Sequence, residues 1–309
     1  MLVARRLMVL PALVAPILVP AFVGGSDASR EERERAERPP VLTHAEVAPE
    51  PTRAPVSLWS PGHGPHTAFK PATAPRELLL SFDDGPDLSG TPLILEELDR
   101  RGLKAIFFVT GWRLTGRRPE DIARRDLVRK IAAHGHLVAN HTMSHHDLCQ
   151  NPAEQAAEID GNTELIAETT GVRPLLFRSP YGAFCHSLEA SLAARELPDI
   201  GWNIDPQDWK NNDEDAVFGY LTKKIGELHG RGIMLLHDTH AASVHALPRF
   251  LDWLARDNAR AVAAGQPPVN VIDYRVVVPR RPVTASGLPQ LLGAVVADAV
   301  GSVGRHLPR

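Results

Sequence analysis

Leu78-Leu79-Leu80-Ser81-Phe82-Asp83-Asp84-Gly85-Pro86 is the stretch on which the interpretation of the whole chain depends. It begins as a short apolar run, which predicts a buried strand, and it ends in Asp-Asp-Gly-Pro, which predicts a sharp turn. Two adjacent carboxylates, Asp83 and Asp84, therefore stand where a strand gives way to a loop. In α/β folds, ligands bind at that end of the sheet. The alternative is a turn shaped by ordinary turn residues, and the stretch alone does not exclude it.

The composition is that of a globular protein. The chain has 309 residues, of which 43% are hydrophobic and 23% charged, enough for one large domain or two small ones with a sizeable core. Its formal net charge of −3 gives no reason to expect nucleic acid as a partner. The two cysteines, Cys149 and Cys185, are too few for a disulfide framework, although export would permit one bridge between them. The alternative of two buried free thiols stays open.

The first 28 residues have the order of an export signal. Arg5 and Arg6 precede an apolar run at 7–23, and small residues follow it at 24–28. Prolines interrupt the run and weaken a spanning helix, yet its length approaches that of a membrane span. A cleaved signal peptide and an uncleaved anchor therefore both stay open for 1–28. Either one predicts an extracytoplasmic protein, periplasmic or secreted, which contacts a membrane only through this segment.

From about residue 76 the sequence becomes regular. Residues 29–75 are charged and then proline-rich, which predicts a linker. Beyond it, apolar runs that predict strands alternate with helical stretches. Strands are expected at 77–82, 104–110, 136–140, 174–178, 199–204, 232–237 and 269–277, and helices at 91–102, 120–133, from 151 onward, 187–196, 213–228 and 244–264. This alternation predicts a mostly parallel α/β fold, open or closed, in a single domain at 76–280, which a tail at 281–309 follows.

Polar side chains collect at the ends of five of the expected strands. The five clusters are Asp83-Asp84, His141 to His145, Arg178 to Gly182, Asp205 to Trp209 and Leu235 to Asp238. Each cluster has an ordinary interpretation on its own, such as a surface arginine, a helix cap or a core histidine. Five clusters at the same end of one sheet instead predict a functional site.

His141 and His145 have a spacing that is common among metal ligands. His-x-x-x-His puts two imidazoles on one face if the segment is helical, and the alternative is two unrelated surface histidines. The residue after the first histidine is Thr142 rather than the glutamate of zinc proteases, so a base must come from elsewhere. Asp83 and Asp84 can supply a third ligand and a base. Two histidines and one carboxylate leave positions for water and substrate, which indicates a catalytic metal, with zinc as the first candidate and cobalt, nickel or manganese as others.

Taken together, the motifs resemble, in order, the five motifs of the polysaccharide deacetylases, which are the NodB-like carbohydrate esterases of family 4. The matching motifs are Ser81 to Pro86, His141 to His145, Arg178-x-Pro180-Tyr181, Asp205-x-x-Asp208-Trp209 and Leu235-x-His237. The resemblance covers about residues 76–265, and Ser81 stands where the family more often has threonine. It implies a distorted (β/α) barrel with about seven parallel strands, so that the domain at 76–280 is the catalytic domain.

The resemblance also implies a role for each polar residue of the first two motifs. Asp84, His141 and His145 would bind the metal, and Asp83 would be the general base that activates water. Arg178, from the third motif, would pair with Asp83 and hold it in place. Such a metal has two functions, because it lowers the pKa of water and polarises the acetyl carbonyl.

The remaining motif residues would serve the substrate. The main-chain N–H of Tyr181 would help to bind the oxyanion, which a donor beside the metal stabilises. Trp209 and Leu235 would wall the pocket that takes the acetyl methyl group. His237 would be the general acid, oriented and charged by Asp208, because an amine leaves poorly unless it is protonated.

The function predicted from these residues is that of an exported, metal-dependent hydrolase, expected to be a monomer, which removes N-acetyl groups from a polysaccharide. Peptidoglycan, a chitin-like chain and an exported biofilm polymer are all candidate substrates. One alternative is the O-deacetylation of an acetylated polysaccharide such as xylan. Another is a non-catalytic carbohydrate-binding relative, which would require the loss of a motif residue, and none is lost. A small-molecule amidohydrolase is disfavoured by the export signal.

Overall fold

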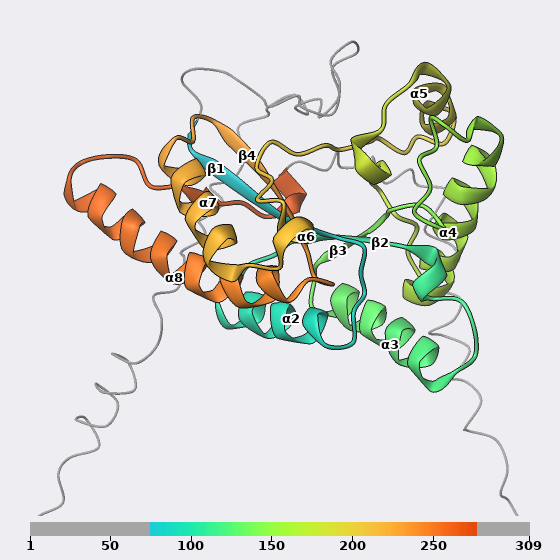
Figure 1. Ribbon diagram of the computed structural model, residues 1–309, viewed down its shortest axis with the longest axis horizontal. Helices are drawn as coiled ribbons and strands as arrows, with labels where there is room; N and C mark the ends of the chain where they lie inside the picture. The colour runs from blue at the N-terminus through green and yellow to red at the C-terminus, as the bar shows by residue number, and fades with distance from the viewer. Residues whose placement is uncertain (1–74, 277–309) are drawn as a thin grey trace, which may run out of the picture. The chain divides into compact units, whose positions relative to one another are not determined.

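The computed structural model describes residues 75–276, drawn in colour in Figure 1. The predicted signal or anchor at 1–28, the linker up to residue 74 and the tail at 281–309 lie outside the described residues. Within 75–276, none of the helices is both long enough and apolar enough to cross a membrane.

The strand that holds the opening stretch, β1 (Glu77–Asp83), lies at the centre of a parallel sheet. It pairs with β2 (Ile106–Val109) on one side and with β4 (Arg231–His237) on the other, and β3 (Leu137–Asn140) extends the sheet beyond β2. A two-residue strand, β5 (Asn270–Val271), pairs with the start of β1. All of these pairings are parallel, which confirms the α/β prediction.

The two faces of β1 pack against different cores. Leu78, Leu80 and Phe82 belong to the large core formed with the helices. Leu79 faces the other way, into a smaller core that also receives side chains from the neighbouring strands and two extended segments: Ile106, Phe108, Ala139, Leu176, Ile200 and Ile233. Because both faces are buried, the strand is a continuous apolar run rather than an alternating one, as is usual for parallel sheets. The alternation nevertheless places Ser81 and Asp83 on the same face of β1 as Leu79.

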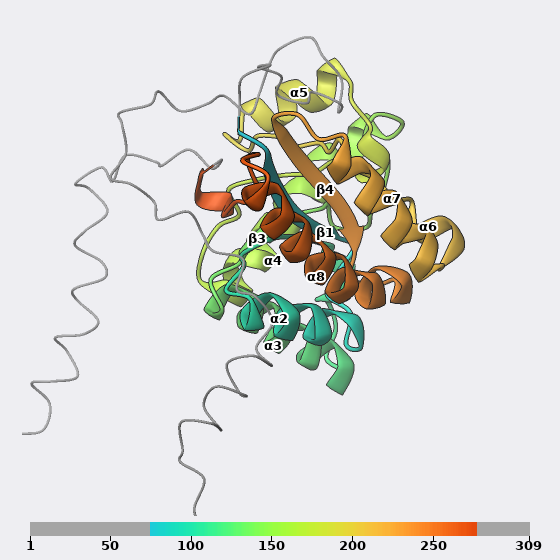
Figure 2. The ribbon, with the colours of Figure 1, turned by 90° about the vertical axis from the view of Figure 1, so that its left-hand side faces the viewer.

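Five helices contribute side chains to the large core on one face of the sheet (Figures 1 and 2). They are α2 (Gly90–Arg100), α3 (Pro119–Ala133), α4 (Gln155–Thr170), α7 (Glu214–Gly226) and α8 (Ala241–Ala263). The other elements are α5 (His186–Ala193), α6 (Asp208–Asn211) and the short 3₁₀ turns η1 (Gly111–Arg113), η2 (Pro152–Glu154), η3 (Pro180–Gly182) and η4 (Tyr274–Val276). Helix α8 packs against both α7 and α2, and it runs alongside β1 and β4 in Figure 2. The expected helices are therefore present, with ends that differ by a few residues.

Two of the seven expected strands are not regular strands. The segments 174–178 and 199–204 are extended but joined to their neighbours only by single parallel bridges, which are Asn140 to Phe177, Phe177 to Asp199 and Ile204 to Met234. The expected strand at 269–277 is reduced to β5 and η4. Residues 75–276 thus contain five regular strands rather than about seven.

The local sequence explains why these segments do not form ladders. Pro174 is the first residue of one segment and Pro198 precedes the other, and neither can donate a main-chain hydrogen bond. The side chain of Arg178 also donates to the carbonyl groups of Ile200 (2.9 Å) and Gly201 (3.1 Å), which are therefore occupied without a neighbouring strand. Both segments are extended, as predicted. However, two of their carbonyl groups accept hydrogen bonds from the buried Arg178 side chain rather than from a neighbouring strand.

Candidate active site

The register of the sheet brings the first and last motifs together. Asp83 is the last residue of β1, and its partner across the pairing with β4 is His237, the last residue of that strand. Asp84 follows at once with a φ of 72°, which turns the chain away from the strand. The turn packs against the residue after His237, since a methyl group on Gly85 would overlap the carboxylate of Asp238. The ends of β1 and β4 therefore form one side of the site.

The loop after β3 supplies His141 and His145, and it is not helical. Side chains hold it instead: the Asn140 amide oxygen accepts the Thr142 N–H (2.8 Å), and the Thr142 hydroxyl accepts the His145 N–H (2.9 Å). Thr142 and His145 have φ values of 68° and 61°, a region that costs energy for residues other than glycine and that is common at functional sites. The two imidazoles converge through this loop rather than through a helical face.

Asp84, His141 and His145 point their ligand atoms at one another. Asp84 Oδ1 lies 3.3 Å from His141 Nε2 and 3.1 Å from His145 Nε2. Neither contact has hydrogen-bond geometry, and among the described residues this buried oxygen has no hydrogen-bond partner. Burial alone would raise the pKa of the Asp84 carboxyl, but its contacts with the two imidazoles and their charge outweigh burial and hold the pKa well below its usual range.

The protonation of His141 indicates what belongs between these atoms. Its Nδ1 is 2.7 Å from the carbonyl oxygen of Arg178, which can only accept, so Nδ1 carries the proton. The Nε2 of a neutral His141 therefore presents a lone pair to the Asp84 carboxylate. A lone pair and an anionic oxygen at this distance repel each other unless a cation lies between them. Without a metal that cation is a proton, since burial lowers the pKa of His141 but the charge of Asp83 and the contact with Asp84 outweigh it and raise the pKa. Two neutral imidazoles and one carboxylate, with a carbonyl fixing a histidine from behind, fit a divalent metal such as zinc.

A second group of possible ligands does not have this property. One ligand atom each of His146, Glu154 and Glu158 also lies within 4.8 Å of the others. However, His146 Nδ1 is 2.8 Å from a carboxylate oxygen of Glu154, and Glu158 accepts the Ser144 N–H at 2.7 Å. These groups satisfy one another, so this group calls for no ion.

Arg178 fixes the orientation of Asp83. Its side chain is fully buried and donates to Asp83 Oδ1 (2.8 Å) and to the Ser81 hydroxyl (2.8 Å). The guanidinium carbon lies 4.1 Å from the centre of the Phe108 ring, which supports it from below. The other carboxylate oxygen, Asp83 Oδ2, lies 3.7 Å from His141 Nε2. One oxygen of Asp83 is therefore held by the arginine while the other faces the Asp84 cluster.

His237 and Asp208 form a buried pair on the opposite side. His237 Nδ1 is 2.8 Å from Asp208 Oδ1, while Asp208 Oδ2 accepts both the main-chain N–H of His237 (2.8 Å) and the hydroxyl of Ser243. Burial opposes the charge on the imidazole, but the hydrogen bond and the charge of Asp208, with smaller contributions from Asp83 and Asp84, raise the pKa of His237 to about 9. His237 Nε2 is directed toward the cluster and lies 4.0 Å from Asp84 Oδ2.

The three predicted substrate residues lie next to these groups. Tyr181 has a φ of 58°, and its hydroxyl lies 3.2 Å from His145 Nδ1. Trp209 follows Asp208 in α6 and is half exposed. Leu235 is buried on β4, two residues before His237 and therefore on the same face of the strand. Their assigned roles remain predictions.

Sequence reasoning missed two serines that support the site. The Ser81 hydroxyl accepts a hydrogen bond from Arg178 and donates one to the carbonyl of Met234 (2.6 Å), and so it links the arginine to β4. Ser243 lies in the first turn of α8 and donates to Asp208 across 35 positions of sequence. Ser81 lies inside a recognised motif and could have been assigned a role, whereas no local pattern singles out Ser243.

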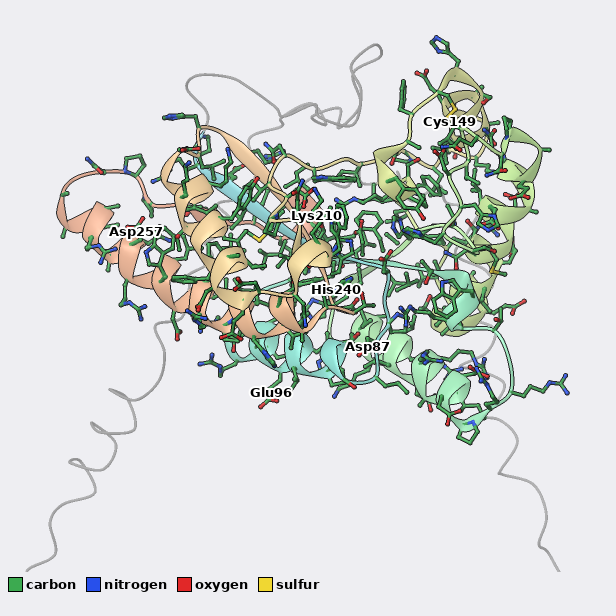
Figure 3. The ribbon with its side chains drawn as sticks, viewed as in Figure 1. Asp87, Glu96, Cys149, Lys210, His240 and Asp257 are labelled. Carbon is green, nitrogen blue, oxygen red and sulfur yellow. A yellow bond between two sulfur atoms is a disulfide. The ribbon has the colours of Figure 1, made fainter. Side chains whose placement is uncertain are left out.

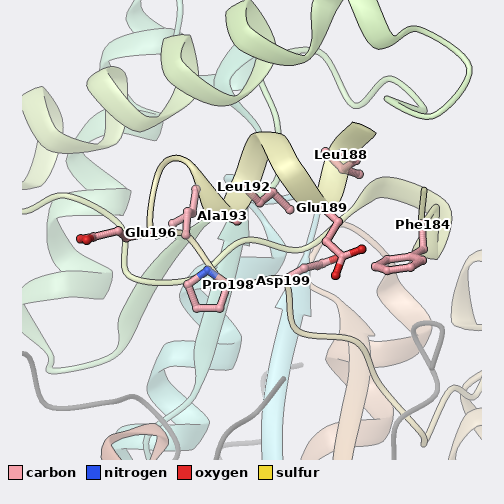
Figure 4. A pocket seen from close by; sticks show the side chains of 9 residues that line it. Phe184, Leu188, Glu189, Leu192, Ala193, Glu196, Pro198 and Asp199 are labelled. Atoms are coloured by element: carbon pink, nitrogen blue, oxygen red, sulfur yellow. The ribbon is translucent and has the colours of Figure 1, made fainter. Parts of the chain in front are cut away.

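A separate cavity lies beside α5 and contains none of the predicted site residues. Its volume is about 300 Å³, and its lining is mostly apolar: Phe184, Leu188, Glu189, Leu192, Ala193, Glu196, Leu197, Pro198 and Asp199 (Figure 4). Phe184 stands at one end of it and Glu196 at the other. It lacks the converging polar groups of the Asp84 cluster, so the cluster is the better candidate for chemistry.

Comparison with known proteins places these residues in context. The sequence profile of the family described as "Polysaccharide deacetylase" matches residues 70–198. A peptidoglycan-N-acetylglucosamine deacetylase of Bacillus cereus is 31% identical over 200 residues, which are 63% of this chain and 69% of the relative. A chitooligosaccharide deacetylase of Bradyrhizobium sp. is 33% identical over 165 residues, which are 53% of this chain and 71% of the relative. The solved family 4 carbohydrate esterase from Streptomyces lividans, in complex with acetate, is similar with a TM-score of 0.51 and 30% identity, covering 62% of this chain and 91% of that one.

Proposed function

The chain belongs to the polysaccharide deacetylase family, and from that premise we propose that it hydrolyses N-acetyl groups of a polysaccharide with the help of a divalent metal. The observation that carries the proposal is the buried Asp84 Oδ1, which has no hydrogen-bond partner among the described residues and faces two histidine Nε2 atoms. The substrate class is a polymer of N-acetylated amino sugars. Relatives named for peptidoglycan and for chitooligosaccharides make both kinds of polymer candidates.

Asp84, His141 and His145 hold the ion in this proposal. A divalent ion bound there supplies Lewis acidity, which lowers the pKa of water and polarises an acetyl carbonyl. Asp83 is the base: Arg178 holds its Oδ1, so its Oδ2 is left to take a proton from the attacking water. The arginine keeps Asp83 correctly oriented without contacting the substrate.

The second proton transfer belongs to His237. Its Nδ1 is committed to Asp208, and its Nε2 gives a proton to the nitrogen that leaves when the C–N bond breaks. Acetate and a free amine are then the products, with one proton moved to Asp83 and one moved from His237. The main-chain N–H of Tyr181 is the proposed oxyanion donor, and Trp209 and Leu235 are the proposed walls of the methyl pocket.

Acetate release tests the proposal. The purified protein is stripped with a chelator, reloaded with zinc, cobalt, nickel or manganese, and assayed on N-acetylated peptidoglycan, chitooligosaccharides and acetylxylan. We expect release from an N-acetylated glycan, abolished by the chelator and restored by at least one ion. Full acetate release from rigorously metal-free protein would contradict the requirement for a metal. Release from acetylxylan alone would favour an O-deacetylase.

We also propose that the protein acts outside the cytoplasm, attached to a membrane at most through residues 1–28. The basic and apolar order of that segment supports export. The Cys149–Cys185 bridge supports an oxidising compartment. Cell fractionation combined with N-terminal sequencing of the mature protein tests the proposal, since an intact Met1 in the cytosolic fraction would contradict export.

A further inference from the structure

The cavity beside α5 serves no step of the proposed reaction, yet it has the features of a binding site (Figure 4). Leu188, Glu189, Leu192 and Ala193 line it from the helix, and their spacing puts them on one helical face. The chain that follows the helix, at 196–199, completes the lining together with Phe184. The volume of about 300 Å³ lies at the lower end of the range found for small-molecule sites, so the cavity suits a small ligand.

The apolar walls of the cavity belong to a packed core rather than to loose surface side chains. Leu188, Leu192 and Leu197 are buried, and they pack in a small third core with Phe177 and the two bridged cysteines. The disulfide also fixes the start of α5, because Cys185 is the residue directly before the helix. The walls are therefore held in place without a ligand, so little free energy would be spent on ordering them when one binds.

The charged groups of the lining are all acidic. They are Glu189, Glu196 and Asp199, and none of the nine lining residues is a lysine, an arginine or a histidine. The imidazole of His186 approaches Glu189 at 3.5 Å, but it is fully exposed and lies outside the lining. An apolar cavity whose only charges are negative favours a positively charged ligand over a neutral or an anionic one.

Asp199 is the carboxylate of the lining that most needs a countercharge. Its Oδ1 accepts the main-chain N–H of Ser179 (3.1 Å), and no lysine, arginine or histidine of residues 75–276 forms an ion pair with it. The charge of Arg178 acts on it, but that guanidinium is paired with Asp83. Burial raises the pKa of Asp199 to about 6, although main-chain N–H groups and nearby positive charges oppose the rise. A carboxylate in this position gains more from a cation than an exposed one does.

We propose that this cavity binds a small organic cation, which is an ammonium group carried by an apolar body such as a phenyl ring. The ammonium pairs with Asp199, and the apolar body packs against the leucine side chains and the exposed ring of Phe184. None of the metal-ligand candidates takes part, so the site is separate from the proposed hydrolysis. It nevertheless adjoins the third motif through the hydrogen bond from Ser179 to Asp199.

Two probes of nearly the same shape and different charge test the proposal. They are 2-phenylethylamine, which is a cation at neutral pH, and 2-phenylethanol, which is neutral. Calorimetry with the zinc-loaded wild type should show that the amine binds and that the Kd of the alcohol is roughly tenfold higher, because a hydrogen bond to a charged group is the stronger one. Equal Kd values for the two probes would overturn the pairing with Asp199, and an amine that does not bind would overturn the site.

Two variants of the lining locate the bound probe. Asp199→Asn keeps an oxygen that can accept from Ser179 but removes the charge, so the Kd of the amine should rise roughly tenfold while that of the alcohol stays the same. Ala193→Leu adds a larger side chain from an exposed position of α5, which fills the cavity and should weaken the binding of both probes. The control Glu168→Gln removes the same charge from an exposed position of α4 outside the lining, and it should change neither Kd. An amine Kd that is unchanged in Asp199→Asn or in Ala193→Leu would place the probe elsewhere and overturn the site.

Discussion

The protonation of His237 is a property of a single residue pair, and it should be visible in the pH dependence of the rate. Because the pKa of His237 is raised to about 9, the proton needed by the leaving amine is held below that pH and lost above it. We expect kcat/KM for an N-acetylated substrate to fall as the pH rises through about 9. In Asp208→Asn the largest of the contributions that raise this pKa is removed, so this alkaline limb should move to lower pH, measured at a fixed metal concentration.

Ser243→Ala is the matched control for that shift. It removes one hydrogen bond to Asp208 but leaves the carboxylate and its contact with His237, so the alkaline limb should move much less. An alkaline limb that stays in place in Asp208→Asn would show that Asp208 does not set the charge of His237.

The two adjacent aspartates should respond differently to the same substitution. Asp83→Asn removes the base and leaves Asp84 and both histidines in place, so we expect bound metal to be retained and kcat to fall by about 10²–10⁴-fold. Asp84→Asn removes the only carboxylate of the ligand set and should weaken metal binding itself. Elemental analysis of the purified variants, together with acetate release, distinguishes them. An equal loss of metal in both would refute the division of roles.

At the scale of secondary structure, the Arg178 side chain makes hydrogen bonds that a neighbouring strand would otherwise make. Its buried side chain joins β1 to the extended segment 199–204 through Asp83, Ser81 and two carbonyl groups. Arg178→Ala would leave the Asp83 carboxylate buried without its countercharge, and we expect the free energy of unfolding to fall by about 3–5 kcal/mol. Urea denaturation followed by circular dichroism measures this.

Arg173→Ala is the control for that loss. It removes an ion pair with Glu164 in which both side chains are exposed, at 2.7 Å, and such pairs contribute about 1 kcal/mol or less. If the two variants lost the same stability, the buried arginine would not be the link between the segments.

The same segments show how far the sequence predicts the fold. The runs at 77–82 and 232–237 became β1 and β4 because their length and continuous apolar character suit a strand buried on both faces. The segment 199–204 differs, because it includes the polar residues Asp199 and Asn203 and is only partly buried. It forms no ladder, and the carbonyl groups of two of its residues accept hydrogen bonds from the side chain of Arg178. A hydrophobic pattern predicts which segments are buried, but it does not predict which groups form hydrogen bonds with their main chain.

The candidate site shows the same limit. The residue types in the five motifs predicted that Asp83, Asp84, His141, His145, Arg178, Asp208 and His237 would meet, and the structure brings them together. The local structure that brings the two histidines together was not predictable, because they converge through a loop held by Asn140 and Thr142 rather than through a helix. Positive φ values at non-glycine residues depend on such contacts and leave no periodic signal.

At the scale of the whole described domain, one covalent link joins two loops of the site. The disulfide between Cys149 and Cys185, visible beside the Cys149 label in Figure 3, connects the loop after His145 with the segment after Tyr181. Its sequence separation is 36 residues, and closing a loop of that size restricts the unfolded chain. We expect reduction to lower the free energy of unfolding by about 2–4 kcal/mol, measured by denaturation with and without a reductant.

The double variant Cys149→Ser, Cys185→Ser is the control, because its stability should not respond to the reductant. Thiol titration of the unfolded, unreduced wild type provides an independent check. Two free thiols, or a denaturation midpoint that the reductant does not change in the wild type, would contradict the bridge.

The central place of β1 has a consequence for how the chain is made. Glu77 and Arg231 are register partners on β1 and β4, and 154 residues separate them. At roughly 5–20 residues per second, a ribosome needs on the order of 10–30 s to deliver the second strand after the first has emerged. During that interval the edge of β1 that pairs with β4 has no partner, although β2 has already emerged, and contacts of such long sequence separation also form slowly. A nascent chain interrupted before β4 therefore keeps this edge of β1 unpaired, and we expect such fragments to aggregate rather than to retain partial activity.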